Sequence, residues 1–232
     1  MIATQTVLPW QELHAELDER GFARTAAVLD ADDCEALASL WDEAEFRSHI
    51  VMARHGFGEG EYRYFANPLP EPVAELRRSL YPPLAEAANR WAEMLGTGER
   101  WPAALDELVE RCHAVGQTRP TPLILRYGEG GYNALHQDLY GELAFPFQVV
   151  TSLSHRGLDY EGGELVLVEQ RPRRQSRAHV VPLERGELLI FTTRERPVAG
   201  SRGYYRAAMR HGVSTVTAGE RTSLGLIFHE AK

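Results

Sequence analysis

The residues with the clearest chemical potential in this chain are two histidines and one aspartate. His136 and Asp138 flank a single glutamine, and His211 follows 73 residues after Asp138. Arg221 stands 10 residues after His211. Two imidazoles and one carboxylate can hold Fe(II) on one face and leave its remaining coordination positions open. The types and order of these residues predict a ferrous-iron site at which oxygen and an organic acid can bind.

Such a site needs two extended segments side by side. Residues i and i+2 of a strand point to the same face, so His136 and Asp138 can bind one ion from a single strand or from its end. His211 must then come from a second strand that passes beside the first. Structural zinc would more often use cysteine, whereas Cys34 and Cys112 belong to no CxxC or Cys/His cluster and are expected to be buried free thiols. An isolated HxD tripeptide is weak evidence, because most histidines are not metal ligands.

The first half of the chain has the apolar spacing of helices. This spacing predicts helices over residues 10–20, 34–41, 73–95 and 103–113. Gly21 is expected to end the first helix, and Pro82-Pro83 to break the third, because proline lacks the helical N–H donor. The alternating and aromatic residues of 48–67, with their glycines, predict a hairpin with a mobile loop.

After Pro122 the pattern changes to short apolar runs separated by turn residues. The predicted strands are residues 123–127, 147–153, 164–168, 179–183, 187–191, 207–216 and 222–228. Seven or eight short strands without intervening helices favour a sandwich or a jelly roll. Helices followed by strands indicate an α+β fold. We expect one domain over residues 1–232, in which 1–121 is mainly helical support with a hairpin and 122–232 is the β core.

Composition limits the partners and the location of the chain. The formal net charge of −8 opposes non-specific binding to duplex nucleic acid, although local basic patches can override that average. No apolar run approaches the roughly 18 residues of a membrane span, and residues 1–10 lack the basic start and long apolar stretch of a secretory signal. We therefore expect a cytoplasmic protein without a membrane partner, and the oligomeric state stays open.

The segment 123–228 resembles the 2-oxoglutarate- and Fe(II)-dependent oxygenase superfamily, in the branch that contains the prolyl hydroxylases. The resemblance rests on Arg126-Tyr127-Gly128, His136-Gln-Asp138, Tyr160-Glu-Gly-Gly-Glu-Leu165, Pro182-Leu-Glu-Arg-Gly-Glu-Leu-Leu-Ile-Phe191, and His211-Gly-Val213 leading to Gly219-Glu-Arg-Thr-Ser223. Residues 47–58, 61–65 and 169–177 are similar to a narrower bacterial family, whose members are labelled as oxygenases acting on damaged DNA.

The resemblance implies a fold and a set of site residues. The fold would be a double-stranded β-helix, or jelly roll, with N-terminal helices packed against it. His136, Asp138 and His211 would bind Fe(II), beside the cosubstrates 2-oxoglutarate and O2. Arg221 would pair with the C5 carboxylate of 2-oxoglutarate, helped by hydroxyls of Tyr127 and Ser223. The alternatives are an exposed strand arginine, a core tyrosine and a polar turn serine.

The reaction implied is hydroxylation of a substrate C–H bond with release of succinate and CO2, or loss of formaldehyde if the carbon was an N-methyl group. Basic residues support a nucleic-acid substrate: they are the 171–177 loop, Arg194, Arg196, Arg202, Arg206 and Arg210. Tyr62, Tyr64, Tyr204 and Tyr205 are candidates for base stacking. Pairing of the arginines with nearby glutamates, among them Glu164, Glu169 and Glu195, is the alternative.

Three other functions compete with this one. Hydroxylation of a protein, peptide or small molecule is favoured by the acidic net charge and by the prolyl-hydroxylase-like spacing from His211 to Arg221. A non-catalytic β-sandwich binding module would keep the same residues as core polar groups. A zinc hydrolase would need a general base near the metal, and the sequence offers no candidate.

Overall fold

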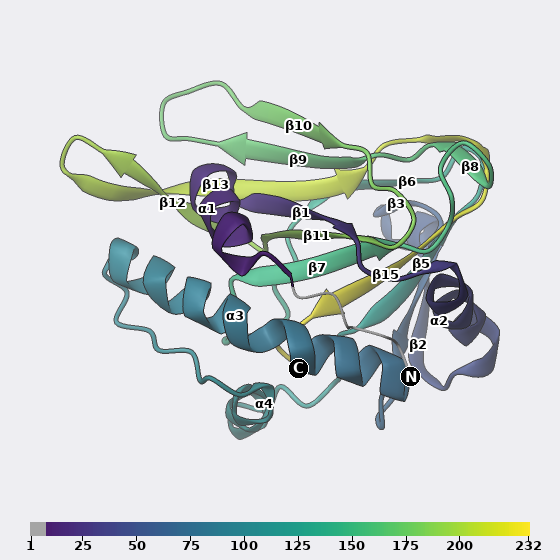
Figure 1. Cartoon of the computed structure of the whole chain (residues 1–232), viewed down its shortest axis with the longest axis horizontal. Coiled ribbons are helices and arrows are strands. Elements are labelled where there is room, and N and C mark those ends of the chain that lie inside the picture. The colour runs from purple at the N-terminus through teal and green to yellow at the C-terminus, as the bar shows by residue number, and fades with distance from the viewer. Residues whose placement is uncertain (1–7) are drawn as a thin grey trace.

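The computed structural model describes residues 8–232 (Figure 1). The helices of this part are α1 (Trp10–Arg20), α2 (Ala31–Glu43), α3 (Glu71–Leu95) and α4 (Leu105–Ala114), with a 3₁₀ turn η1 (Met52–His55). The strands are β1 (Phe22–Ala27), β2 (Phe46–Val51), β3 (Gly58–Glu59), β4 (Glu61–Phe65), β5 (Leu123–Tyr127), β6 (Tyr132–His136), β7 (Phe147–Ser152), β8 (Tyr160–Gly162), β9 (Leu165–Gln170), β10 (Arg177–Val181), β11 (Glu187–Thr192), β12 (Glu195–Gly200), β13 (Gly203–Val213), β14 (Val216–Gly219) and β15 (Arg221–Ile227).

Two antiparallel sheets form the body of the molecule. The major sheet has seven strands in the order β1-β11-β7-β15-β5-β4-β2. The minor sheet has the order β10-β9-β13-β6-β3, and β12 pairs with β13. Apolar side chains from both sheets, such as Val150 and Phe191 from the major and Leu167 and Met209 from the minor, share one buried cluster. The predicted α+β fold with a jelly-roll core is confirmed.

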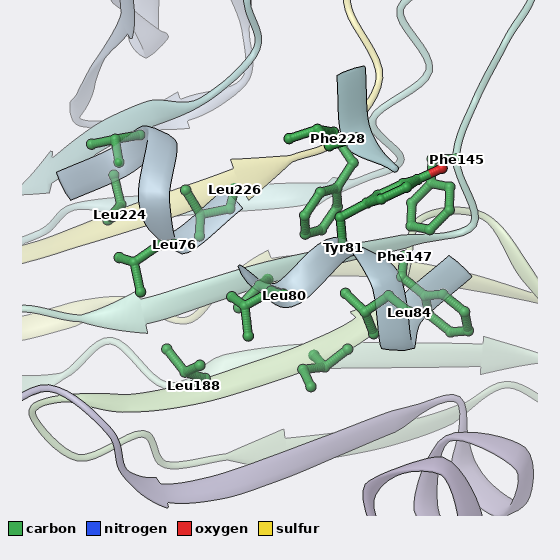
Figure 2. Close-up of a cluster of buried hydrophobic side chains, with 14 of the residues drawn as sticks. Leu76, Leu80, Tyr81, Leu84, Phe145, Phe147, Leu188, Leu224, Leu226 and Phe228 are labelled. Carbon is green, nitrogen blue, oxygen red and sulfur yellow. The ribbon is translucent and has the colours of Figure 1, made fainter. Parts of the chain in front are cut away.

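Helix α3 covers the face of the major sheet that points away from the minor sheet (Figure 1). Both faces of β7 and β15 are buried. The contact between helix and sheet joins Leu76, Leu80, Tyr81 and Leu84 to Phe145, Phe147, Leu188, Leu224, Leu226 and Phe228 (Figure 2). Burying one such side chain contributes roughly 1.5–3 kcal/mol, so this contact holds α3 firmly against the major sheet.

The predicted break at Pro82-Pro83 was wrong, because α3 continues through both prolines. Each proline removes a donor to the carbonyl four residues earlier, here those of Arg78 and Ser79. Arg78 and Ser79 lie on the exposed side of α3, where water can satisfy their carbonyls, while Leu80, Tyr81 and Leu84 bury the opposite side. Burial of one face therefore outweighs the local proline signal.

Other boundaries follow from local chemistry. α1 spans the predicted residues and ends at Gly21 with φ of 80°, in the left-handed region that glycine tolerates. α2 begins earlier than predicted, because the Asp30 side chain accepts a hydrogen bond from the Asp33 N–H and caps the helix at Ala31. The first half also supplies β1, β2 and β4 to the major sheet.

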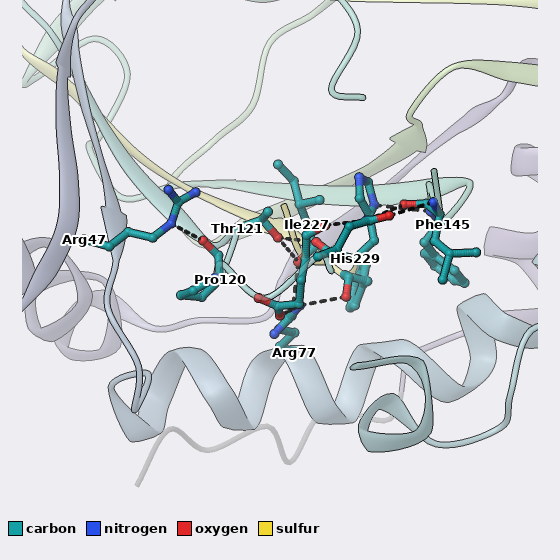
Figure 3. Close-up of polar contacts among 11 residues, drawn as sticks. Arg47, Arg77, Pro120, Thr121, Phe145, Ile227 and His229 are labelled. Atoms are coloured by element: carbon teal, nitrogen blue, oxygen red, sulfur yellow. Dashed lines mark hydrogen bonds and ion pairs between the residues drawn. The ribbon is translucent and has the colours of Figure 1, made fainter. Parts of the chain in front are cut away.

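Polar groups tie the end of β15 to α3 in a buried corner (Figure 3). Arg77 donates to the carbonyls of Ile227 and Phe228 and pairs with Glu230 at 2.7 Å. The Thr121 hydroxyl donates to the His229 carbonyl at 2.5 Å. We call these residues, with Phe145, the C-terminal corner. Elsewhere Cys34 and Cys112 are buried and free, as predicted, and no helix among residues 8–232 is long and apolar enough to cross a membrane.

Candidate active site

The predicted triad comes together between neighbouring strands of the minor sheet. β6 and β13 pair with His136 opposite His211. Asp138 follows β6 by two residues, and its carboxylate oxygens lie 3.1 Å from His211 Nε2 and 3.6 Å from His136 Nε2. One atom from each residue lies within 4.8 Å of the others. Three distant positions of the sequence thus offer their ligand atoms to one point.

A β-bulge orients this arrangement. Between the pairs His211–His136 and Val213–Asn133, β6 carries one residue more than β13. The extra residue lets His136 and Asn133 both face the cleft, although an odd separation would otherwise place them on opposite faces. Gly212 stands opposite the bulge, where a Cβ atom would lie 2.5 Å from the Asn133 carbonyl oxygen. Glycine is therefore required beside His211.

The protonation states of His136 and Asp138 suit a metal ion. His136 Nδ1 donates to the Ala134 carbonyl at 2.7 Å, which leaves the Nε2 lone pair toward the cleft. Burial, and then His211, lower the pKa of His136. Burial alone would raise the pKa of Asp138, but the charge and hydrogen bond of His211 outweigh it and hold that pKa well below its usual range. A neutral imidazole and an ionised carboxylate result at neutral pH.

Asp138 is also held from behind by two tyrosines. The Tyr140 hydroxyl donates to Asp138 Oδ1 at 2.6 Å, and the Tyr64 hydroxyl donates to Tyr140 at 2.9 Å. Burial and the charge of Asp138 raise the pKa of Tyr140, so its hydroxyl stays protonated and keeps donating. Sequence reasoning missed this contact, although Tyr140 stands two residues after Asp138. The chain Tyr64–Tyr140–Asp138 fixes the carboxylate as partners of metal ligands do.

The residues present fit a metal ion of the predicted kind. Two imidazoles and one carboxylate, without a fourth protein ligand in the cluster, form the facial set that Fe(II) oxygenases use. His211 Nδ1 is buried without a hydrogen-bond partner, and Phe191 packs on its ring at 4.8 Å between centroids. Within residues 8–232 no other group of three His, Cys, Asp or Glu side chains is placed to hold a metal ion.

Arg221 is a buried cation without an ion-pair partner within 4.0 Å among the described residues. It begins β15, pairs with Tyr127 of β5 in register and is 2% exposed. Its Nη1 donates to the Ser223 hydroxyl at 3.1 Å, and its guanidinium lies 5.6 Å from the ring centre of Tyr127. No carboxylate of the described residues lies within 4.0 Å of it, and its Nε has no partner. A buried charge in this state fits an anionic ligand.

One cavity of about 350 Å³ joins the triad to Arg221. All six residues predicted for the site line it, namely Tyr127, His136, Asp138, His211, Arg221 and Ser223. Burial raises the pKa of Tyr127 to about 12, so its hydroxyl, which accepts from Asn133 Nδ2 at 3.4 Å, is neutral. The rest of the wall is largely aromatic and aliphatic, with Tyr62, Tyr64 and Phe57 among its residues.

A protein-family model matches residues 60–231, and its description reads "Oxygenase, catalysing oxidative methylation of damaged DNA". The match covers more than half of the chain. The protein belongs to this oxygenase family, named Oxygenase-NA. Two relatives from Mycobacterium tuberculosis, uncharacterized protein MT2286 of strain CDC 1551 / Oshkosh and uncharacterized protein Rv2227 of strain ATCC 25618 / H37Rv, are each 52% identical over 167 residues, which is 72% of this chain and 72% of theirs.

Solved structures similar to this oxygenase show the same fold. A Pseudomonas putida prolyl-4-hydroxylase is 17% identical with a TM-score of 0.57, covering 96% of this chain and 100% of that one. An oxidoreductase of the 2OG-Fe(II) oxygenase family from Burkholderia pseudomallei is 20% identical with a TM-score of 0.56, covering 98% and 95%. The Trichoplax adhaerens prolyl hydroxylase, solved with a hypoxia inducible factor peptide, is 15% identical with a TM-score of 0.53, covering 95% and 89%.

Other polar residues near the site differ in whether they contact the cavity. Gln148 lines the cavity, and its buried Nε2 has no partner among the described residues. The Ser152 hydroxyl instead donates to the Ser154 carbonyl, away from the cavity. His55 is exposed and stacks on Phe57, which lines the cavity, with 5.3 Å between ring centroids. Arg171 and Arg196 pair with Glu169, as the alternative of glutamate pairing predicted.

Proposed function

We propose that this oxygenase binds Fe(II) through His136, Asp138 and His211 and uses 2-oxoglutarate and O2 to hydroxylate a C–H bond of its substrate. The observation that carries the proposal is the presence of an unpaired, buried Arg221 in the same cavity as the triad. A dicarboxylate with one end at the metal site needs a cation at its other end. Arg221 supplies that cation, and Ser223 and Tyr127 supply hydroxyls beside it.

When bound, Fe(II) with 2-oxoglutarate and O2 supplies the oxidant: one oxygen atom enters the new C–OH group, the other enters succinate, and C1 of 2-oxoglutarate leaves as CO2. The side chains of this chain bind, orient and shield. Tyr140 holds Asp138, and Ala134 fixes the tautomer of His136. The aromatic wall excludes water from the reacting groups.

Metal content tests the triad. Purified wild-type protein loaded anaerobically with Fe(II) should hold iron, whereas His211→Ala and Asp138→Ala should lose it. Elemental analysis after removal of free metal measures the ratio of iron to protein. Full iron occupancy in both variants would reject this ligand assignment.

Cosubstrate binding tests Arg221. Arg221→Met should weaken 2-oxoglutarate binding by about 100-fold, because it removes one partner of a buried charge pair, while iron stays bound. Titration calorimetry with Mn(II)-loaded protein measures the affinity without turnover. Arg126→Met is the matched control, since Arg126 neighbours Tyr127 on β5 but does not line the cavity. Equal affinities in wild type and Arg221→Met would refute the role.

For the substrate we propose an N-methylated base of damaged nucleic acid. The description of the family supports this choice. Hydroxylation of an N-methyl carbon leaves an N–CH2OH group, which breaks to formaldehyde and the unmodified base. The cavity of about 350 Å³ limits entry to a single extruded or unpaired base.

Peptide hydroxylation is the second candidate, favoured by the fold shared with the Pseudomonas putida prolyl-4-hydroxylase. The two candidates differ in their products. Methylated oligonucleotides should stimulate succinate release and yield formaldehyde in equal amount, whereas proline-containing peptides would stimulate succinate release without formaldehyde. Stimulation by peptides or small metabolites and none by methylated oligonucleotides would overturn the nucleic-acid proposal.

A further inference from the structure

Two hairpins of the minor sheet project to the same side of the molecule (Figure 1). One consists of β9 and β10 with the turn 171–176, and the other of β12 and β13 with the turn 201–202. They are neighbours, because β13 pairs with β9 as well as with β12.

These hairpins carry an excess of positive charge in an acidic protein. No Asp or Glu stands in residues 170–183 or 196–219, although the chain has a net charge of −8. Five exposed arginines of these segments have no carboxylate within 4.0 Å among the described residues; they are Arg173, Arg174, Arg177, Arg202 and Arg210. The two carboxylates of these hairpins do not neutralise them, because Glu169 binds Arg171 and Arg196 and Glu195 pairs with Arg206.

The positively charged β12–β13 hairpin begins close to the triad. Gln137, which stands between two triad residues, donates through Nε2 to the carbonyls of Arg194 and Met209, each at 2.8 Å. The β12–β13 hairpin therefore starts beside the metal site. From His211 to the tip at Gly203, β13 extends for about 26 Å at roughly 3.3 Å per residue. Arg206 and Arg210 alternate with buried residues on its outer face.

We infer that these arginines form a docking surface for the phosphodiester backbone of single-stranded nucleic acid, which leads an unpaired base to the cavity. We call Arg173, Arg174, Arg177, Arg202 and Arg210 the arginine strip. A guanidinium group can donate two hydrogen bonds to the oxygens of one phosphate. If these arginines were only solvated surface charge, carboxylates would be expected near them. Tyr204, 48% exposed between Arg202 and Arg206, offers a ring on which a base can stack. The choice of nucleic acid over another polyanion rests on the proposed function.

Binding can be measured without catalysis. The probe is a fluorescein-labelled single-stranded oligonucleotide of about 12 nucleotides, longer than the strip at roughly 3.4 Å per nucleotide. The full chain titrates the probe at several salt concentrations, with fluorescence anisotropy as the readout. Arg173→Gln/Arg202→Gln, with one change in each hairpin, should lower affinity about tenfold or more in low salt. The slope of log K against log salt should fall by about 1.4, or roughly 0.7 per lost contact.

The matched control is Arg78→Gln/Arg100→Gln. Both arginines are exposed and lie outside the two hairpins. Their substitution removes the same amount of charge as the strip variant does. Equal losses in the two double variants would show that only net charge matters and would overturn the strip, as would unchanged binding in Arg173→Gln/Arg202→Gln. Displacement of the probe by poly-glutamate at equal charge concentration would also overturn it, in favour of an acidic protein.

Failure of the strip and failure of the proposed function are distinguishable. The strip variant should keep wild-type affinity for Mn(II) and 2-oxoglutarate, because neither changed arginine lines the cavity. Absence of 2-oxoglutarate binding in the wild type would reject the cosubstrate proposal and leave the anisotropy result standing.

Discussion

Arg77 and Arg221 are buried arginines on opposite sides of the major sheet, and they differ in the groups that surround them. Arg77, on the α3 side, is satisfied by Glu230 and by the carbonyls of Ile227 and Phe228. Arg221, on the cleft side, has the Ser223 hydroxyl and the faces of two tyrosine rings. A buried charge that is paired inside the fold is needed for the stability of the fold. A buried charge that is unpaired in a cavity can instead bind a ligand of opposite charge. The C-terminal corner and the cleft should therefore respond oppositely to mutation.

The largest expected effect is the loss of the internal counter-ion. Glu230→Gln should destabilise the protein by about 3–5 kcal/mol, because it leaves the Arg77 guanidinium buried without an opposite charge. Urea unfolding measures the change. Glu71→Gln removes the exposed partner of Arg78 and should cost less than about 1 kcal/mol. If Glu230→Gln changed the unfolding free energy only slightly, the proposed difference between Arg77 and Arg221 would be wrong.

The C-terminal corner should also make stability depend on pH. Burial lowers the pKa of His229 to about 4, while the unfolded chain titrates near the ordinary 6.5. Between these values the unfolded state binds a proton that the native state excludes. Stability is therefore complete above about pH 6.5 and falls by about 3 kcal/mol as the pH drops to about 4.

His229→Asn isolates this effect. Asparagine keeps an acceptor for the Phe145 N–H, which His229 Nδ1 binds at 3.2 Å, but it does not titrate. The difference in unfolding free energy between wild type and variant should narrow steadily from pH 7 to pH 4. A constant difference over that range would contradict the assignment.

In the cleft, a mutation should change the affinity for the metal ion. Tyr140→Phe removes the hydrogen bond to Asp138 and should weaken Mn(II) binding by about 10–100-fold, as loss of a metal ligand's partner does. Calorimetric titration of metal-free protein measures it. Tyr81→Phe is the matched control, because this buried hydroxyl donates to the Pro102 carbonyl on the α3 side. Equal affinity in wild type and Tyr140→Phe would remove the positioning role.

The smallest expected effect is on the stability of the ligand-free Arg221 variant. Arg221→Met should change the unfolding free energy by less than about 1 kcal/mol, or increase it, because no ion-pair partner is lost. Wild type should gain about 2.7 kcal/mol from 2-oxoglutarate at 100 times its Kd, and the variant, whose affinity is about 100-fold weaker, should gain only about 0.4 kcal/mol at the same concentration. A cost as large as that of Glu230→Gln would mean that Arg221 is structural.

The sequence was sufficient for the ligands and insufficient for what positions them. His136, Asp138, His211 and Arg221 could be predicted, because their residue types and order carry the chemistry. Tyr140 could not, since its contact with Asp138 depends on the path of the segment between β6 and β7. Strands β1 and β6 were missed for the same reason, because their pairing partners lie far away in the sequence. β12 was also missed, although it pairs with the next strand, β13.

β15 connects the two sides of this comparison. Each of its seven residues is buried, and β5 and β7 bind it along both edges. Its amide protons can therefore reach solvent only through large-scale opening of the molecule. A ligand carboxylate bound to Arg221 at one end of β15 makes such opening rarer. Binding in the cleft should therefore slow deuterium uptake at the other end of β15, beside Arg77.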